Sequence, residues 1–235
     1  MRAMILAAGR GERMRPLTDK MPKSMLEVSG KPLIQYHVEN LVQAGIVDIV
    51  INHALFGEQI EAHLNDGKSL GASITYSSEG DHPLETAGGI VKALPLLGDK
   101  SFITVNADIW TDFPFQSLLR ECDGLPDDPA NNLAHIILVD NPEYNPNGDF
   151  ALSDRKVLNQ GDPMLTFSGI SIFKPEFFKD CPSGSASLAP LLRLAISQGQ
   201  VTGSHYQGLA IVGRSTFCYG ECGHLDRLSF SGSPA

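Results

Sequence analysis

Short apolar runs alternate with helix-like segments through the first half of the chain, and this alternation limits the fold more than any other feature of the sequence. Strands are predicted at residues 3–7, 48–52, 73–76 and 102–105, and helices at residues 32–44, 56–64 and 86–94. Strands that alternate with helices in this way form a sheet with helices on both of its faces. The sequence therefore predicts an α/β fold, a Rossmann-like mixed and mainly parallel sheet flanked by helices, with ligands bound at the carboxyl ends of the strands.

The pattern is less regular beyond Trp110. Strands are predicted at residues 133–139 and 165–173, a helix at residues 188–197, and a loop at residues 141–149, which are rich in Pro, Asn and Gly. We expect these elements to continue the same sheet, because 235 residues with 42% hydrophobic content can bury one substantial core and are too few for two full-sized domains. A single domain without internal repeats is therefore predicted.

Composition argues against several classes of function. Charged residues make up 19% of the chain and the formal net charge is -9, so no general surface for nucleic acid is expected. The apolar run at residues 3–8 ends in Gly-Arg-Gly-Glu-Arg, which favours a buried strand over a signal peptide. No apolar stretch has the length that a bilayer requires. We therefore expect a cytoplasmic protein without nucleic-acid or membrane partners.

The cysteines Cys122, Cys181, Cys218 and Cys222 are too few for the disulfide scaffold of a small secreted domain. The spacing of Cys218, Cys222 and His224 invites comparison with a zinc site, but no separated second pair of ligands accompanies them. Reduced thiols without a bound metal are therefore predicted.

A glycine-rich loop, Ala8-Gly9-Arg10-Gly11-Glu12-Arg13, follows the first predicted strand. Glycines at positions 9 and 11 allow backbone N–H groups to approach an anion closely, and Arg13 could neutralise charge on a phosphoryl group. The loop is neither a Rossmann loop, because Met14 occupies the place of the third glycine, nor a Walker A loop, because Gly-Lys-Ser/Thr is absent. A glycine turn with surface arginines is the alternative, but the strand-to-loop context together with Lys23 favours phosphate binding.

The longer segment LAAGRGERMRPLTDKMPKSMLEVSGKPLI, residues 6–34, resembles the first strand, loop and first helix of the sugar-1-phosphate nucleotidyltransferases. One departure is Ser24-Met25, where the family usually has Pro-Leu. The resemblance covers residues 1–208 and implies the nucleotide-diphospho-sugar transferase fold. It also implies a nucleotide-binding half at residues 1–110, a sugar-binding half at residues 111–208, and an atypical C-terminal tail at residues 209–235.

Asp108 follows the buried strand at residues 102–105, in the sequence Asn106-Ala107-Asp108. Mg²⁺ commonly binds through one or two carboxylates together with substrate phosphates, although a turn or capping aspartate is the alternative. Asn106-Ala107-Asp108 resembles the metal-binding element of the family, which implies that Asp108 holds Mg²⁺. The resemblance further implies that Arg13 holds the leaving pyrophosphate and that Lys23 holds the α-phosphate or the sugar phosphate. Arg13, Lys23 and Asp108 are therefore the predicted catalytic residues.

The loop that precedes the predicted helix at residues 86–94 reads Leu84-Glu85-Thr86-Ala87-Gly88-Gly89. In the family the corresponding run lines the nucleobase pocket, while an ordinary helix N-cap at Thr86 is the structural alternative. The Glu85 form resembles the branch that transfers uridylate from UTP to N-acetylmuramate 1-phosphate in bacterial peptidoglycan recycling. The predicted nucleotide contacts are Leu6, Ala8, Gly9, Gly11, Glu79, Glu85, Thr86 and Gly88.

Four small or polar residues, three of them in the second half of the chain, are candidates for a sugar pocket. The predicted sugar contacts are Asn106, Gly148, Asp149 and Ser168. A β-turn glycine and a strand serine are the alternatives for Gly148 and Ser168. The alternative function is that of a mannose- or heptose-1-phosphate guanylyltransferase. Uracil and guanine are distinguished by a few backbone contacts, and the sequence does not display these contacts. The substrates are then a nucleoside triphosphate and a sugar 1-phosphate, and the oligomeric state stays open.

The resemblance ends after Gly208. The family continues with an aromatic residue, one further residue and the aspartate that is its second metal ligand, whereas this chain reads Leu209-Ala210-Ile211-Val212-Gly213. Loss of an anionic ligand should weaken Mg²⁺ binding, although water can fill the vacancy. Asp226 lies too late to match the motif, and a surface role is favoured for it. A nucleotide- or sugar-binding relative with impaired catalysis is therefore a further alternative.

Overall fold

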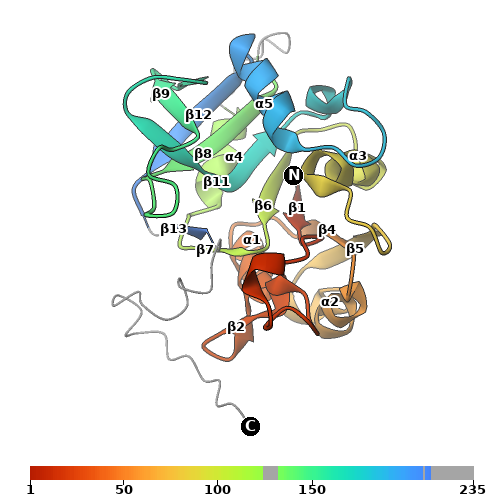
Figure 1. Cartoon of the computed structure of the whole chain (residues 1–235). Coiled ribbons are helices and arrows are strands. Elements are labelled where there is room, and N and C mark those ends of the chain that lie inside the picture. The colour runs from red at the N-terminus through yellow and green to blue at the C-terminus, as the bar shows by residue number, and fades with distance from the viewer. Residues whose placement is uncertain (124–131, 209, 213–235) are drawn as a thin grey trace.

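The computed structural model describes residues 1–123, 132–208 and 210–212 (Figure 1). Within them, a nine-stranded sheet has the order β5-β4-β1-β6-β11-β8-β12-β10-β9. Its strands are β1 (Arg2–Leu6), β4 (Asp48–His53), β5 (Ser73–Ser78), β6 (Phe102–Asn106), β8 (Ala134–Val139), β9 (Phe150–Ser153), β10 (Lys156–Leu158), β11 (Met164–Phe173) and β12 (Val201–Tyr206). The predicted α/β fold with a mixed sheet is confirmed.

Parallel pairing is concentrated in the first half of the chain. β1 pairs in parallel with β4 and β6, and β4 pairs in parallel with β5. β11 is antiparallel to both β6 and β8, and β10 is antiparallel to β9 and β12, while β8 and β12 are parallel. The register places Leu6 beside both Asn52 and Asn106. The carboxyl ends of three neighbouring strands therefore meet at one edge of the sheet.

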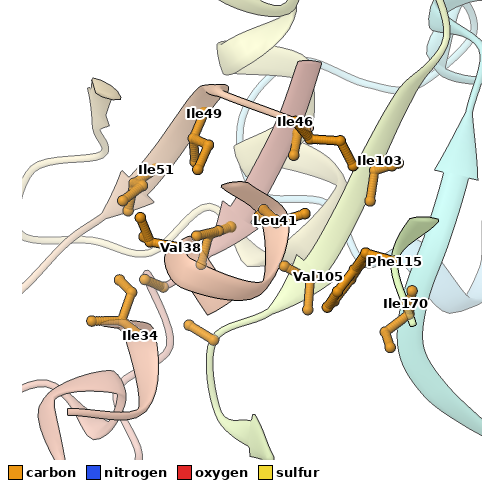
Figure 2. Packing of buried hydrophobic residues seen from close by; sticks show 14 of the residues in the cluster. Ile34, Val38, Leu41, Ile46, Ile49, Ile51, Ile103, Val105, Phe115 and Ile170 are labelled. Atoms are coloured by element: carbon orange, nitrogen blue, oxygen red, sulfur yellow. The ribbon is translucent and has the colours of Figure 1, made fainter. Parts of the chain in front are cut away.

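Helices pack on both faces of the sheet, and the strands alternate accordingly. The helices are α1 (Leu33–Gln43), α2 (Gly57–Leu64), α3 (Glu85–Leu97), α4 (Gln116–Asp123) and α5 (Leu188–Ser197). One apolar cluster joins α1, α2 and α4 to alternate strand residues such as Ile5, and a second joins α3 and α5 to the opposite face, where Met4 lies. Figure 2 shows Val38 and Leu41 of α1 gathered with Val105 of β6 in the first cluster.

Several elements were not predicted from the sequence. They are β2 (Glu27–Val28), β3 (Lys31–Pro32), β7 (Ile109–Thr111), β9, β10, β12, β13 (Ala210–Val212), α4 and the short 3-10 helices η1 (Glu12–Met14), η2 (Lys23–Met25), η3 (Lys68–Leu70) and η4 (Pro175–Phe178). Most are too short to show a period. The N-cap alternative for Thr86 is wrong, because α3 begins at Glu85 and the N-cap position is Leu84.

The chain after Gly208 returns to the sheet edge near the end of β6. β13 pairs antiparallel with β7, with Ile211 opposite Trp110 and Val212 opposite Ile109. The predictions for the C-terminal residues concern positions outside the described residues. They are the absence of a zinc site at Cys218, Cys222 and His224, and the surface role of Asp226. None of the helices that the structure describes is long and apolar enough to cross a membrane.

Candidate active site

A cleft of about 840 Å³ opens at the edge where β1, β4 and β6 end. It extends from the glycine loop across the strand ends to β11, to the loop before β9 and to the first turns of α5. The predicted site residues that line it are Leu6, Ala8, Gly9, Gly11, Lys23, Glu85, Thr86, Asn106, Asp108 and Asp149. The structure thus brings together predicted residues from both halves of the chain.

Gly11 shapes the glycine loop. Its backbone φ is +61°, and a Cβ atom there would lie 2.9 Å from Thr18 Cγ2 and 3.1 Å from Lys23 Cβ. The Thr18 hydroxyl donates to the Gly11 carbonyl at 2.8 Å, which fixes the turn. Gly9 has no atom within 4 Å of the corresponding position, so the cleft beside it is open. Arg13 belongs to η1, but its side chain lies outside the described part of the structure.

Lys23 and Asp108 form an ion pair in the cleft. Lys23 Nζ lies 2.7 Å from Asp108 Oδ2, and the two side chains are 9% and 39% exposed. The lysine side chain is nearly buried, whereas the carboxylate is partly exposed and lines the cleft. A carboxylate with an open side fits Mg²⁺, which takes one or two carboxylates and completes its shell with phosphate oxygens and water. No group of three or more His, Cys, Asp or Glu residues within the described ranges could hold a metal by itself.

A neutral histidine lies behind this ion pair. His37 of α1 is 2% exposed, and its Nε2 lies 2.9 Å from the carbonyl oxygen of Ile109. Burial lowers the pKa of His37 to about 4, although the backbone hydrogen bond to Ile109 and the charge of Asp108 oppose this shift. Nε2 therefore carries its proton as a donor to that carbonyl at neutral pH. The contact fixes the backbone that directly follows Asp108.

The residues at the start of α3 have different roles. Glu85 and Thr86 line the cleft, and Glu85 has a φ of +56°, a strained conformation for a residue with a side chain. Gly88 does not line the cleft: a Cβ atom there would lie 2.1 Å from the carbonyl oxygen of Gly184. Glu79 is 8% exposed and also lies behind the cleft wall, where it accepts a hydrogen bond from the backbone N–H of Leu84 at 2.6 Å.

Two of the predicted sugar contacts do not reach the cleft. Ser168 is fully buried, and its Oγ donates to the Ile137 carbonyl at 2.8 Å and accepts from the Ile170 N–H at 3.1 Å. Gly148 has a φ of +65° and packs against Asn141 and Leu165. The structure therefore assigns these two residues the strand and turn roles that were the alternatives.

Asn106 and Asp149 do line the cleft. Asp149 Oδ2 accepts a hydrogen bond from the Phe167 N–H at 2.9 Å, which orients the carboxylate. Asn106 lies against a bulge in β11, where a Cβ atom on Gly169 would come within 2.6 Å of Asn106 Nδ2. Both side chains are therefore held in place in the cleft.

Other cleft residues were not singled out from the sequence. They include Arg10, Asn52, Thr104, Tyr144, Asn145, Thr166, Phe167, Ser171 and Arg193. Asn52 could have been predicted as a cleft residue, because it is a polar residue at the end of a predicted parallel strand and ligands bind at such ends. The others depend on strand order and on loop conformation, which the sequence does not display.

Comparison with known proteins identifies the family of the chain. Residues 2–148 match the family model described as Nucleotidyl transferase. A Neisseria meningitidis serogroup B protein named N-acetylmuramate alpha-1-phosphate uridylyltransferase is 51% identical over 214 residues, which are 89% of this chain and 91% of the relative. A Caulobacter vibrioides protein of the same name is 36% identical over 217 residues, which are 88% of this chain and 89% of the relative.

The fold has a solved counterpart. A crystal structure from Bacillus anthracis, described as a glucose-1-phosphate thymidylyltransferase in complex with sucrose, has a TM-score of 0.83. It is 19% identical and covers 99% of this chain and 98% of its own, and it supports the predicted fold type alone. The resemblance to sugar-1-phosphate nucleotidyltransferases that residues 6–34 carry is confirmed by the family model and the two relatives. The chain belongs to the nucleotidyl transferase family.

Proposed function

We propose that this protein transfers a uridylyl group from UTP to N-acetylmuramate 1-phosphate and releases pyrophosphate. The ion pair of Lys23 and Asp108, beside the glycine loop, carries the proposal, because it supplies a phosphate-binding cation and a metal-binding carboxylate at one place. The base and the sugar are taken from the names of the two relatives. We place the reaction in the cytoplasm, in the recycling of peptidoglycan sugars.

The reaction forms one P–O bond and breaks another. An oxygen of the sugar phosphate attacks the α-phosphorus of UTP, the bond from that phosphorus to the bridging oxygen breaks, and pyrophosphate leaves with the electron pair. The nucleophile is already anionic, so we assign no general base. Catalysis then depends on holding the two anions in line and on neutralising their charge.

The residues around the glycine loop would bind the phosphates. Lys23 would place its nearly buried ammonium group on the α-phosphate or the sugar phosphate. When Mg²⁺ is bound, Asp108 would hold it and the ion would neutralise charge on phosphate oxygens. The backbone N–H groups near Gly9 and Gly11 would face the triphosphate, and Arg13 would hold the leaving pyrophosphate.

The two ends of the cleft would divide the substrates between them. Leu6, Ala8, Glu85 and Thr86 line the end that we assign to the nucleoside, with Glu79 and Gly88 supporting it from behind. Asn106 and Asp149 line the end that we assign to the sugar hydroxyls. Residues 1–110 would therefore serve mainly the nucleotide, and residues 111–208, together with Asn106, would serve the sugar.

The sequence after Gly208 differs from that of the family, and this difference affects the expected affinity for Mg²⁺. β13 brings residues 211 and 212 opposite Trp110 and Ile109, directly after Asp108. The family has a carboxylate in this stretch, whereas this chain has Ile211 and Val212. We propose that Mg²⁺ binds through Asp108, the substrate phosphates and water, and that turnover needs a higher Mg²⁺ concentration than a site with two carboxylates.

Pyrophosphate release tests the proposal. The protein is incubated with UTP or GTP and with N-acetylmuramate, mannose or heptose 1-phosphate over a range of Mg²⁺ concentrations. We expect release with UTP and N-acetylmuramate 1-phosphate. Release with GTP and mannose or heptose 1-phosphate instead would establish the guanylyltransferase alternative. Calorimetric binding of UTP without release at any Mg²⁺ concentration would establish the binding protein with impaired catalysis.

A further inference from the structure

A chain of buried hydrogen bonds runs behind the nucleoside end of the cleft. The Ala7 N–H donates to Asn52 Oδ1 at 3.0 Å, Asn52 Nδ2 donates to Glu79 Oε1 at 2.6 Å, and the Leu84 N–H donates to Glu79 Oε2 at 2.6 Å. Asn52 is 2% exposed and Glu79 is 8% exposed. The chain of bonds therefore joins the glycine loop, the ends of β4 and β5, and the start of α3.

The amide of Asn52 has only one workable orientation in this chain of bonds. The amide oxygen of Asn52 faces a donor, and its amide nitrogen faces a carboxylate. Rotating the amide by half a turn would set its oxygen against Glu79 and its NH₂ against the Ala7 N–H. Buried polar groups that lose their partners are costly, because the protein interior does not replace the lost bond with water. The network should therefore hold its members at fixed separations.

Gly89 allows α3 to pack directly on the pair. A Cβ atom at Gly89 would lie 2.4 Å from Glu79 Oε1 and 2.8 Å from Asn52 Nδ2. Any larger residue would push the helix away from the two side chains. The second glycine of the Gly88-Gly89 pair is thus explained by this network, and the first is explained by its contact with Gly184.

Both ends of the network belong to cleft walls. Ala7 directly precedes the glycine loop, and Leu84 precedes Glu85 and Thr86, which line the opposite side. We propose that Asn52 is a positioning residue for the nucleotide: through Glu79, it sets the separation between the phosphate-binding loop and the start of α3. This inference rests on the proposed nucleotidyl transfer, but it does not depend on which base is transferred.

Exchanging the amide and the carboxylate between residues 52 and 79 tests the network. Asn52→Asp removes the only donor between the two side chains and leaves two carboxylates facing each other. Glu79→Gln leaves one donor facing another at one of its two contacts. In the double variant, the new aspartate accepts from the Ala7 N–H and from the new glutamine amide, whose oxygen accepts from the Leu84 N–H. All three hydrogen bonds are therefore restored, and donor and acceptor are exchanged only in the bond between residues 52 and 79.

Triphosphate binding is measured by calorimetry with UTP and with GTP, alongside the KM values of both substrates and the thermal midpoint. We expect Asn52→Asp to weaken triphosphate binding by about tenfold or more, and the double variant to recover to within about threefold of the original protein. The KM of the sugar phosphate should change by less than about twofold, because the network contacts only the nucleotide side of the cleft. Asn40→Asp on α1, outside the cleft lining, is the matched control for the added charge and should bind like the original protein.

Two results would overturn the inference: triphosphate binding by Asn52→Asp that equals the original, or a double variant that binds no better than Asn52→Asp. If Asn52→Asp does not fold, the triphosphate affinity of Glu79→Gln is compared with that of the double variant. The inference then requires that Glu79→Gln binds the triphosphate more weakly. An original protein that binds GTP and not UTP would contradict the proposed uridylyl transfer, while the same cycle read with GTP would still decide the role of Asn52.

Discussion

The first half of the cleft is built on parallel strands that end together, whereas the second half is built on antiparallel strands and loops. The shared register of β1, β4 and β6 brings Leu6, Asn52 and Asn106 to one edge. In the second half, the loop before β9 and the bulge in β11 supply the lining. Parallel strands thus concentrate polar side chains from distant positions at one place, while the antiparallel half obtains its lining from irregular segments.

The two halves also differ in how their polar groups are held. In the first half, charged side chains bind each other, as Lys23 binds Asp108 at 2.7 Å. In the second half, Asp149 is held by the backbone N–H of Phe167 at 2.9 Å. Removing one member of a side-chain pair takes away the opposite charge that the other member contacts, so substitutions in the first half should have the larger effects.

The largest effect is expected for Asp108→Asn. This change removes the proposed metal ligand and leaves the nearly buried Lys23 without its carboxylate. Turnover should fall by about a thousandfold, a typical loss for a group that stabilises transition-state charge. The measurement is the rate of pyrophosphate release at saturating substrates. Asp48→Asn, an exposed aspartate at the opposite end of β4, is the control, and a comparable loss there would remove the special role of Asp108.

A somewhat smaller loss is expected for Lys23→Met. Methionine keeps most of the apolar packing of the lysine side chain but lacks its charge, so the phosphates would lose one cation. We expect turnover to fall by about a hundredfold, with binding of the sugar phosphate also weakened. Lys20→Met, an exposed residue in the same segment, should be neutral. Turnover within threefold of the original in Lys23→Met would show that Lys23 serves only the packing of the loop.

The buried His37 should make the stability of the folded protein depend on pH. Its pKa is about 4 in the folded protein and 6.5 in a model peptide, so between these values the unfolded chain binds a proton that the folded protein does not. This difference should remove roughly 2 to 3 kcal/mol of stability as the pH falls from about 6.5 to 4. Urea unfolding at several pH values should show a weaker pH dependence for His37→Gln, which keeps an amide donor for Ile109. An unchanged pH dependence would contradict the neutral histidine.

The smallest effect is expected in the second half, for Asp149→Asn. The amide keeps an oxygen for the Phe167 N–H but loses the negative charge that would accept bonds from sugar hydroxyls. We expect the KM of the sugar phosphate to rise by about tenfold with the KM of UTP unchanged. Asp154→Asn, outside the cleft lining, is the control. A rise in the KM of UTP instead would break the assignment of the two halves.

The sequence predicts the first half well because its signals are local. β4 begins at the predicted Asp48, α2 ends at the predicted Leu64, and the glycine loop and Asp108 follow their predicted strands. The Lys23–Asp108 pair and the Asn52–Glu79 bond join residues that are 85 and 27 positions apart, so only the tertiary fold reveals them.

The second half was less predictable for two physical reasons. β12 has the sequence Val-Thr-Gly-Ser-His-Tyr and lacks a clear apolar period, although it pairs with β8 along its whole length. The bulge between Phe167 and Ser171 changes which side chains of β11 face the cleft, and it turns Ser168 into the interior. Simple alternation along the strand could not place Ser168.

The central claim is nucleotidyl transfer to a sugar phosphate, and identification of the products tests it most directly. The protein is incubated with UTP, Mg²⁺ and N-acetylmuramate 1-phosphate that carries ¹⁸O in the bond between the sugar and the phosphate, and the products are analysed by mass spectrometry. Attack of the sugar phosphate on the α-phosphorus predicts equal amounts of pyrophosphate and UDP-N-acetylmuramate, with the label retained in the nucleotide sugar. Formation of UMP in place of the nucleotide sugar, or loss of the label, would contradict the account.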